Sequence, residues 1–176
     1  TVISLFVLPF FINGQRAAAA ESKKMFTVGI LHPEMNAFHA NISNSVILKG
    51  QEKGWVVIPM TAGVDAQKQL DQMENLIAMG VDAILITPVD AKAICAGVKK
   101  ALDAGIPVYG IDRTTIGCKI NMTVQSDNYM GGTQGAAGVV KFLTQKNGEP
   151  KGLVLELQGD MASNVAQLRN KGFLDG

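Results

Sequence analysis

The sequence predicts an α/β fold in which helices cover both faces of a parallel sheet, a doubly wound arrangement. From Phe26 onward, short apolar runs alternate with longer amphipathic runs, which is typical of consecutive strand–helix units. Glycine closes each of the first three amphipathic runs, as expected at helix C-termini. The composition, 47% apolar and 18% charged over 176 residues, is that of a globular protein.

The first unit pairs a strand at residues 26–31 with a helix at about residues 38–53, which ends at Gly54. A second strand follows at residues 55–60. Helical spacing predicts that the inward face of this helix carries Ile42, Val46 and Ile47.

The second helix begins after Asp65, whose carboxylate can accept hydrogen bonds from first-turn amides, and it ends before Gly80. The third strand is expected at residues 83–87. Three- and four-residue spacing places on the inward face of this helix Leu70, Met73, Leu76 and Ile77.

The third helix is expected to begin after Asp90, another capping residue, and to stop at Gly105 before a strand at residues 108–111. Its apolar face should carry Ile94, Val98, Ala101 and Leu102.

The same alternation continues to the end of the chain. A short stretch at residues 122–124 precedes a helix of small residues at about 129–143, a strand at 152–157 and a helix from about Ser163. The chain therefore divides into an N-terminal lobe at residues 25–125, a usual domain size, and the start of a C-terminal lobe at 126–176, which we expect to be incomplete here.

Residues 1–20 have the pattern of a secretory signal peptide remnant. Residues 1–12 are almost wholly apolar, and residues 17–20 form a small-residue stretch suited to cleavage. A transmembrane anchor would need about 20 apolar residues, and this run is shorter and contains Pro9. We therefore expect cleavage near Ala20 and export to the periplasm.

Charge and cysteine content limit the kinds of partner. The 16 basic and 15 acidic residues give a net charge of +1 and are spread along the chain, so we expect no nucleic acid partner. Cys95 and Cys118 can pair, but the predicted helical position of Cys95 favours a buried thiol. Two histidines and two cysteines at unrelated spacings make no metal-binding pattern, and we expect no cofactor.

Polar side chains follow the predicted strands where each one ends. The carboxyl ends of parallel strands share one edge of the sheet, where ligands of such folds bind. Amide, carboxylate and guanidinium groups can hydrogen-bond hydroxyls, and an aromatic ring can cover the C–H face of a sugar. The candidate ligand-binding residues are Asn36, Phe38, His39, Thr87, Asp112, Arg113 and, in the second lobe, Arg169.

Each first-lobe candidate also has a purely structural interpretation. Asn36 can serve as a helix cap, and Phe38 and His39 as packing residues of their helix. Asp112–Arg113 can be a surface turn or an ion pair, and Thr87 a strand end. Their shared location at one edge of the predicted sheet favours a ligand role for the group.

Five motifs together resemble the periplasmic sugar-binding proteins of the ribose-binding type, the substrate-binding components of ABC transporters. They are ILITPVD at residues 84–90, GIPV at 105–108, IDR at 111–113, SDN at 126–128 and ELQG at 156–159. The resemblance implies the type I periplasmic binding protein fold, in which two doubly wound lobes are joined by three crossing segments.

The resemblance also implies a site and a function. His39 stands where the family has a second aromatic ring and Thr87 where an amide is common, which changes the hydroxyl pattern and pocket shape. The implied function is capture of a monosaccharide or related polyol by a monomer, without catalysis, for a membrane ABC permease. The family's other cleft residues fall on Asn36, Phe38, Asp112, Arg113 and Arg169.

Three other functions remain open. A secreted sensor would present a sugar or signalling furanose to a membrane chemoreceptor and would look the same in this chain. A sugar-responsive repressor shares the fold, but it would begin with a helix-turn-helix and a basic face. Glycosidase chemistry on paired carboxylates such as Asp112 and Asp160 is also open, although motifs of dinucleotide, nucleotide, serine-hydrolase and zinc-protease sites are absent.

Overall fold

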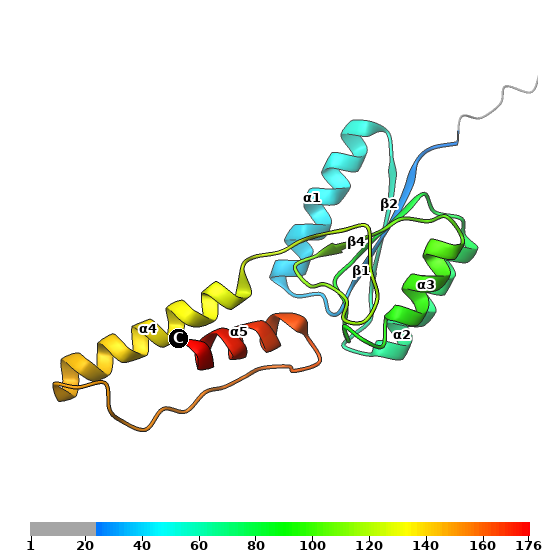
Figure 1. Ribbon diagram of the computed structural model, residues 1–176. Coiled ribbons are helices and arrows are strands. Elements are labelled where there is room, and N and C mark those ends of the chain that lie inside the picture. The colour runs from blue at the N-terminus through cyan, green and yellow to red at the C-terminus, as the bar shows by residue number, and fades with distance from the viewer. Residues whose placement is uncertain (1–23) are drawn as a thin grey trace, which may run out of the picture.

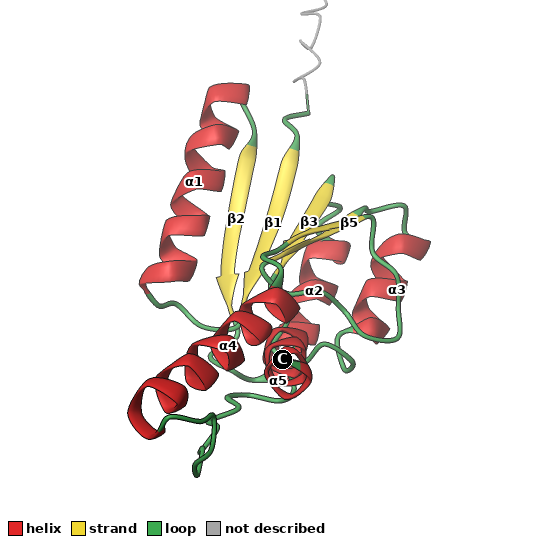
Figure 2. Cartoon of the chain, turned by 60° about the vertical axis from the view of Figure 1, so that its left-hand side comes forward, coloured by secondary structure: helices red, strands yellow, loops and turns green. Residues whose placement is uncertain are grey.

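A five-stranded parallel sheet with the strand order β2-β1-β3-β4-β5 forms the larger part of the molecule (Figures 1 and 2). The computed structural model describes residues 24–176, so the predicted signal peptide lies outside the described residues. Every neighbouring pair in the sheet is parallel, which confirms the predicted fold class. The strands are β1 (Thr27–His32), β2 (Val56–Thr61), β3 (Ala83–Ile86), β4 (Val108–Ile111) and β5 (Met122–Val124).

Helices lie on both faces of this sheet, and two more extend away from it. Figure 2 shows α1 on one side and α2 and α3 on the other, while α4 and α5 lie beyond the carboxyl ends of the strands. The helices are α1 (Ala37–Lys53), α2 (Ala66–Ala78), α3 (Cys95–Asp103), α4 (Asn128–Asn147) and α5 (Asn164–Asp175).

The strand order reverses at β1, which has β2 on one side and β3 on the other. The connections that leave the carboxyl ends of β1 and β3 therefore run in opposite directions. In doubly wound sheets this switch point opens the crevice in which ligands bind.

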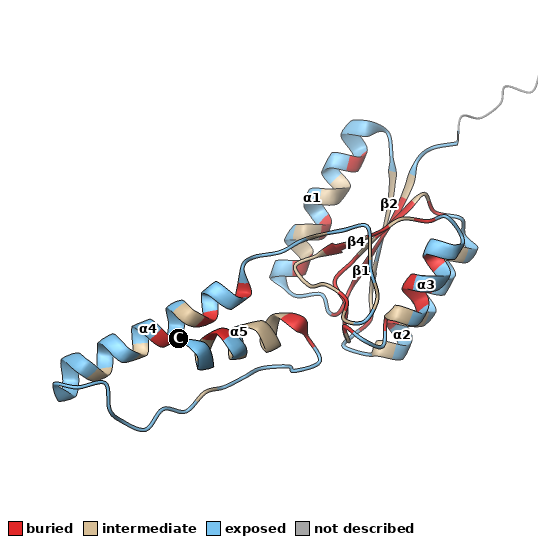
Figure 3. Cartoon of the chain, viewed as in Figure 1, coloured by how far each residue is buried: buried red, intermediate tan, exposed pale blue. Residues whose placement is uncertain are grey.

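The hydrophobic core lies between the sheet and helices α2 and α3, as the red segments of Figure 3 show. Met73 and Leu76 of α2 and Val98 and Ala101 of α3 are fully buried there, as their spacing predicts. Leu102, also predicted to face inward, is 38% exposed because α3 turns it to the rim of the core.

Helix α1 buries a different stripe from the predicted one. Ile42, Val46 and Ile47 are half-buried, whereas the fully buried positions are His39, Ser43 and Gly50. The reason is close approach to the sheet. A Cβ on Gly50 would lie 2.6 Å from Cγ2 of Val57, so a larger residue would push the helix outward.

Helix α3 begins later than predicted. The carboxylate of Asp90 accepts hydrogen bonds from the amides of Lys92 and Ala93 and so caps a separate turn. The α-helix itself starts at Cys95, one turn further along.

Cys95 and Cys118 form a disulfide, so the prediction of a buried thiol is wrong. The loop after β4 returns over the start of α3, where the amide of Ile116 donates to the carbonyl of Ala91 at 2.7 Å. This return brings the two Cα atoms to 5.6 Å, within the range that a disulfide spans.

The predicted strand at residues 152–157 is not formed. The segment is extended and exposed, with Leu153, Leu155 and Leu157 each more than four-fifths exposed. A strand requires a hydrogen-bonded neighbour, and within residues 24–176 none lies beside it.

Helices α4 and α5 pack closely against each other through two glycines. A Cβ on Gly132 would overlap the carbonyl oxygen of Arg169, and one on Gly172 would overlap that of Tyr129. Among residues 24–176, no helix combines the length and hydrophobicity needed to cross a bilayer.

Candidate functional site

The carboxyl ends of β1, β3 and β4 are tied together by hydrogen bonds at the predicted ligand edge. The amide of Thr87 donates to the carbonyl of Leu31 at 2.9 Å, and its hydroxyl donates to the carbonyl of Ile111 at 2.9 Å. Thr87 is 1% exposed, so its side chain fastens β3 to β4 and its hydroxyl proton is already used. The loop that follows β3 is fixed in turn by the guanidinium of Arg113, which donates to the carbonyl of Pro88 at 3.2 Å.

Asp112 has a left-handed backbone, with φ of 65°, directly after β4. This conformation is unfavourable for residues other than glycine, although aspartate tolerates it better than most. Its amide donates to the carbonyl of Val124 at 2.8 Å, which holds the strained turn. Backbone strain that the surrounding structure maintains is concentrated at functional sites.

The carboxylate of Asp112 and the guanidinium of Arg113 lie side by side at this edge. Their nearest atoms are 4.0 Å apart, and their side chains are 28% and 22% exposed. The pair is therefore partly desolvated but reachable, and it offers both acceptors and donors to a hydroxylated ligand.

Asn36 is the N-cap of α1. Its side-chain oxygen accepts from the amide of His39 at 3.0 Å, and its side-chain nitrogen donates to Glu34 at 3.0 Å. Phe38, the second residue of the same helix, is 52% exposed, so it is not a core residue. An exposed ring at the start of α1 is available to cover an apolar ligand face.

His39 is 3% exposed, and neither of its ring nitrogens has a hydrogen-bond partner among the described residues. Burial, then the charge of Arg113, lowers its pKa, while the carboxylates of Asp112 and Glu34 raise it. Leaving a buried polar group unpaired costs about 1–3 kcal/mol, so such groups are rare and concentrate at functional sites.

Sequence reasoning missed two buried polar residues at this edge. His32, the last residue of β1, is fully buried and shares a hydrogen bond of 2.7 Å with the hydroxyl of Ser43. Gln69 of α2 donates to the carbonyl of Thr87 at 3.0 Å and accepts from the amide of Val89 at 2.8 Å, so it fixes the turn after β3. The sequence did contain a signal for Gln69, because a polar residue on the otherwise apolar inward face of a helix indicates a buried hydrogen-bonding role.

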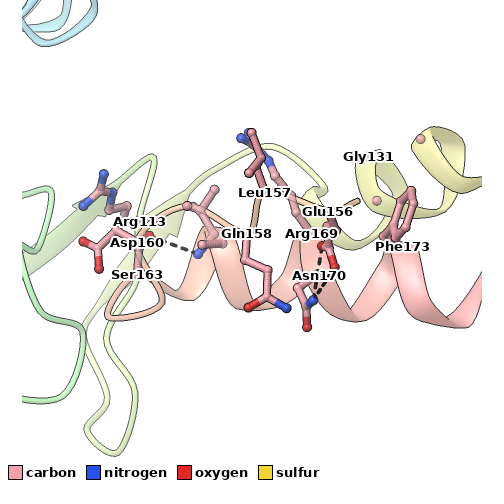
Figure 4. Close-up of a pocket in the computed structure, with 15 residues that line it drawn as sticks. Arg113, Gly131, Glu156, Leu157, Gln158, Asp160, Ser163, Arg169, Asn170 and Phe173 are labelled. Carbon is pink, nitrogen blue, oxygen red and sulfur yellow. Dashed lines mark hydrogen bonds between the residues drawn. The ribbon is translucent and has the colours of Figure 1, made fainter. Parts of the chain in front are cut away.

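A cavity of about 650 Å³ lies between the α4–α5 pair and residues 156–160 (Figure 4). Arg113 reaches it from the sheet, and Arg169 lines it from α5, so two predicted residues share this cavity. The guanidinium of Arg169 also donates to the side-chain oxygen of Asn128 at 2.9 Å, which ties α5 to the start of α4. The lining does not include the other candidates, Asn36, Phe38, His39, Thr87 and Asp112.

Asn164 links the two parts of the molecule and was not predicted. Its side-chain oxygen accepts from the amide of Thr114 at 3.0 Å, and its side-chain nitrogen donates to Gln125 at 3.2 Å. No group of three or more histidine, cysteine or acidic side chains in the described part of the chain is placed to hold a metal ion.

A family model described as a periplasmic binding protein domain matches residues 29–176. The chain belongs to this family. The resemblance drawn from the sequence motifs is thereby confirmed, as is the type I periplasmic binding protein fold.

Several curated and solved relatives of this periplasmic binding protein are sugar-binding proteins. The ribose import binding protein RbsB of Bacillus subtilis (strain 168) is 36% identical over 154 residues, which cover 86% of this chain and 48% of the relative. The chain spans about half the length of the curated relatives it matches.

Two solved structures show the same fold. A carbohydrate transporter solute binding protein from Agrobacterium radiobacter, in complex with D-arabinose, has a TM-score of 0.77 at 26% identity and covers 88% of this chain and 53% of its own. The fructose binding periplasmic domain of a hybrid two component system has a TM-score of 0.78 at 25% identity and covers 85% of this chain and 49% of its own.

Proposed function

We propose that the full-length protein captures a monosaccharide or closely related polyol between two lobes and delivers it to an ABC permease. Residues 25–125 would form the first lobe and residues 126–176 the opening of the second. Export to the periplasm would follow cleavage near Ala20, and the protein would act as a monomer. The sugars named for its relatives support this class of ligand.

The observation that carries the proposal is the partly exposed Asp112–Arg113 pair after β4, together with an exposed Phe38 at the start of α1. The carboxylate and guanidinium can bind hydroxyls through charge-assisted hydrogen bonds, and the ring can cover the C–H face of the sugar. Arg169 would contribute from the second lobe, while Asn36, His39 and Thr87 would shape the edge. This set recognises a ligand without a catalytic step, so no product should form from the sugars tested.

The test is a thermal-shift screen of the full-length protein against D-ribose, D-arabinose, D-fructose, D-allose and myo-inositol, followed by Asp112→Asn. Asparagine has nearly the same shape and tolerates the left-handed backbone, so the variant should fold while losing the charge. We expect affinity for the stabilising sugar to fall roughly tenfold or more, since a hydrogen bond to a charged group is lost. Unchanged ligand-induced stabilisation would mean that the site is assigned wrongly.

A sensing role is the second candidate, because one structural relative is the periplasmic domain of a hybrid two component system. It would use the same sugar site but a membrane chemoreceptor in place of the permease. Reconstitution of sugar uptake with the cognate permease separates the two roles.

A further inference from the structure

Three aromatic rings form a row from the interior of the sheet to the exposed Phe38. The His32 ring lies 5.2 Å from the His39 ring, at an interplanar angle of 48°. The His39 ring lies 5.2 Å from the Phe38 ring and meets it edge-on at 75°. His32, at the inner end, is 0% exposed and has no role in the site described so far.

A hydrogen bond fixes the His32 ring at the inner end of this row, whereas no hydrogen bond to the described residues fixes the His39 ring in its middle. His32 is anchored by the 2.7 Å hydrogen bond between its Nε2 and the hydroxyl of Ser43. Neither ring nitrogen of His39 has a partner in the described part of the chain. The orientation of the His39 ring therefore depends on packing against the rings on either side of it.

We propose that His32 is a positioning residue of the sugar site, which holds the His39 ring so that His39 supports the Phe38 ring against the sugar. This role rests on the proposed function. Edge-on and tilted ring contacts at these distances are favourable beyond the burial of their area. Loss of the inner ring leaves a space into which His39 can turn, which withdraws support from Phe38.

The row is uncharged at neutral pH. Burial, followed by the neighbouring His39, lowers the pKa of His32 to about 4. Arg113 opposes a charge on His39, and Asp112 and Glu34 favour one. Protonation would place a buried positive charge between the rings, so the affinity for sugar should fall on acidification.

The test is isothermal titration of full-length wild type, His32→Phe and His32→Leu with the five probes of the thermal-shift screen. Leucine removes the ring, and we expect affinity for the bound probe to fall roughly five- to tenfold. Phenylalanine keeps a ring, and we expect affinity within about twofold of wild type. As the pH falls from about 5 toward the His32 pKa of about 4, affinity should decline in wild type and decline less in His32→Phe.

A control variant separates positioning from general destabilisation. Ile84→Val lies in the core on the α2 face of the sheet and should lower the melting temperature without changing affinity. If His32→Leu binds as tightly as wild type, or if both His32 variants lose affinity equally, the positioning role is wrong and the proposed function stands. A wild type that binds none of the five probes overturns both.

Discussion

At the scale of single residues, the buried His32 has a consequence for stability as well as for binding. Its imidazole is sealed between β1 and α1, with the hydroxyl of Ser43 as its hydrogen-bond partner. A neutral imidazole is accommodated there, and a charged one would be desolvated without an acidic partner. Protonation of His32 at low pH should therefore destabilise the folded state.

The free energy of unfolding should fall as pH is lowered from about 7 to about 4. The unfolded chain takes up a proton on His32 near its ordinary pKa of 6.5, whereas in the folded state that pKa is lowered to about 4. Protonation between these values favours the unfolded state, so stability is lost over this window. The full shift corresponds to roughly 3 kcal/mol, measurable by urea denaturation at several pH values.

The matched control for this prediction is His32→Phe, which cannot take up a proton. Its stability should vary less between about pH 7 and about pH 4 than that of wild type. An equally steep decline in the variant would show that other groups cause the acid sensitivity.

Single residues also mark the limit of what the sequence could predict. Asn36 and Asp65 were recognisable as helix caps because capping depends on neighbours three residues away or fewer. His32 was not, because its partner Ser43 is 11 residues away and comes into contact only when α1 packs on the sheet. The disulfide was missed for the same reason, since its cysteines are 23 residues apart.

At the scale of elements, amphipathic spacing predicted α2 well and α1 poorly. The buried positions of α2 include the apolar Met73 and Leu76, so hydrophobic periodicity reports most of its buried face, and the polar Gln69 is the exception. The buried positions of α1 are histidine, serine and glycine, which carry no such signal. The contact between α4 and α5 depends likewise on glycines that periodicity does not detect.

Gly132→Ala and Gly172→Ala should each destabilise the contact between α4 and α5. The added Cβ would overlap the carbonyl oxygen of Arg169 or of Tyr129, and backbone cannot move aside cheaply. We expect a loss of about 1–3 kcal/mol in thermal or urea unfolding.

Gly138→Ala is the matched control, since it lies in the same helix α4 with open space around its Cβ position. It should raise stability by about 0.5–1 kcal/mol, because alanine is the better helix former. A comparable loss at Gly138 and Gly132 would contradict a specific role of the contact between α4 and α5.

At the scale of the whole molecule, the fold class follows from local patterning, because each unit is a short strand, a helix and a turn. The strand expected at residues 152–157 shows the opposite case. Its apolar run has strand character, but a strand exists only through pairing with a neighbour, which is a non-local property. The hydrogen bonds of Asn164 to Thr114 and Gln125 are also non-local, and the sequence did not predict them for the same reason.

Hydrogen exchange of the chain, followed by mass spectrometry, should separate these regions. Amides of β3, paired on both sides, should exchange slowest, since they open only with the sheet. Amides of residues 152–157 should exchange without protection. Protection of this segment equal to that of β3 would contradict the unpaired arrangement.

The disulfide between Cys95 and Cys118 ties the loop that carries Arg113 to the start of α3. Such bonds form in oxidising compartments and are kept reduced in the cytosol. Protein harvested from a bacterial cytoplasm would therefore carry this loop without its covalent anchor, and a negative sugar titration on such material would reflect the production host. Secretion of the recombinant protein, or refolding under a glutathione redox buffer, is the appropriate route to active samples.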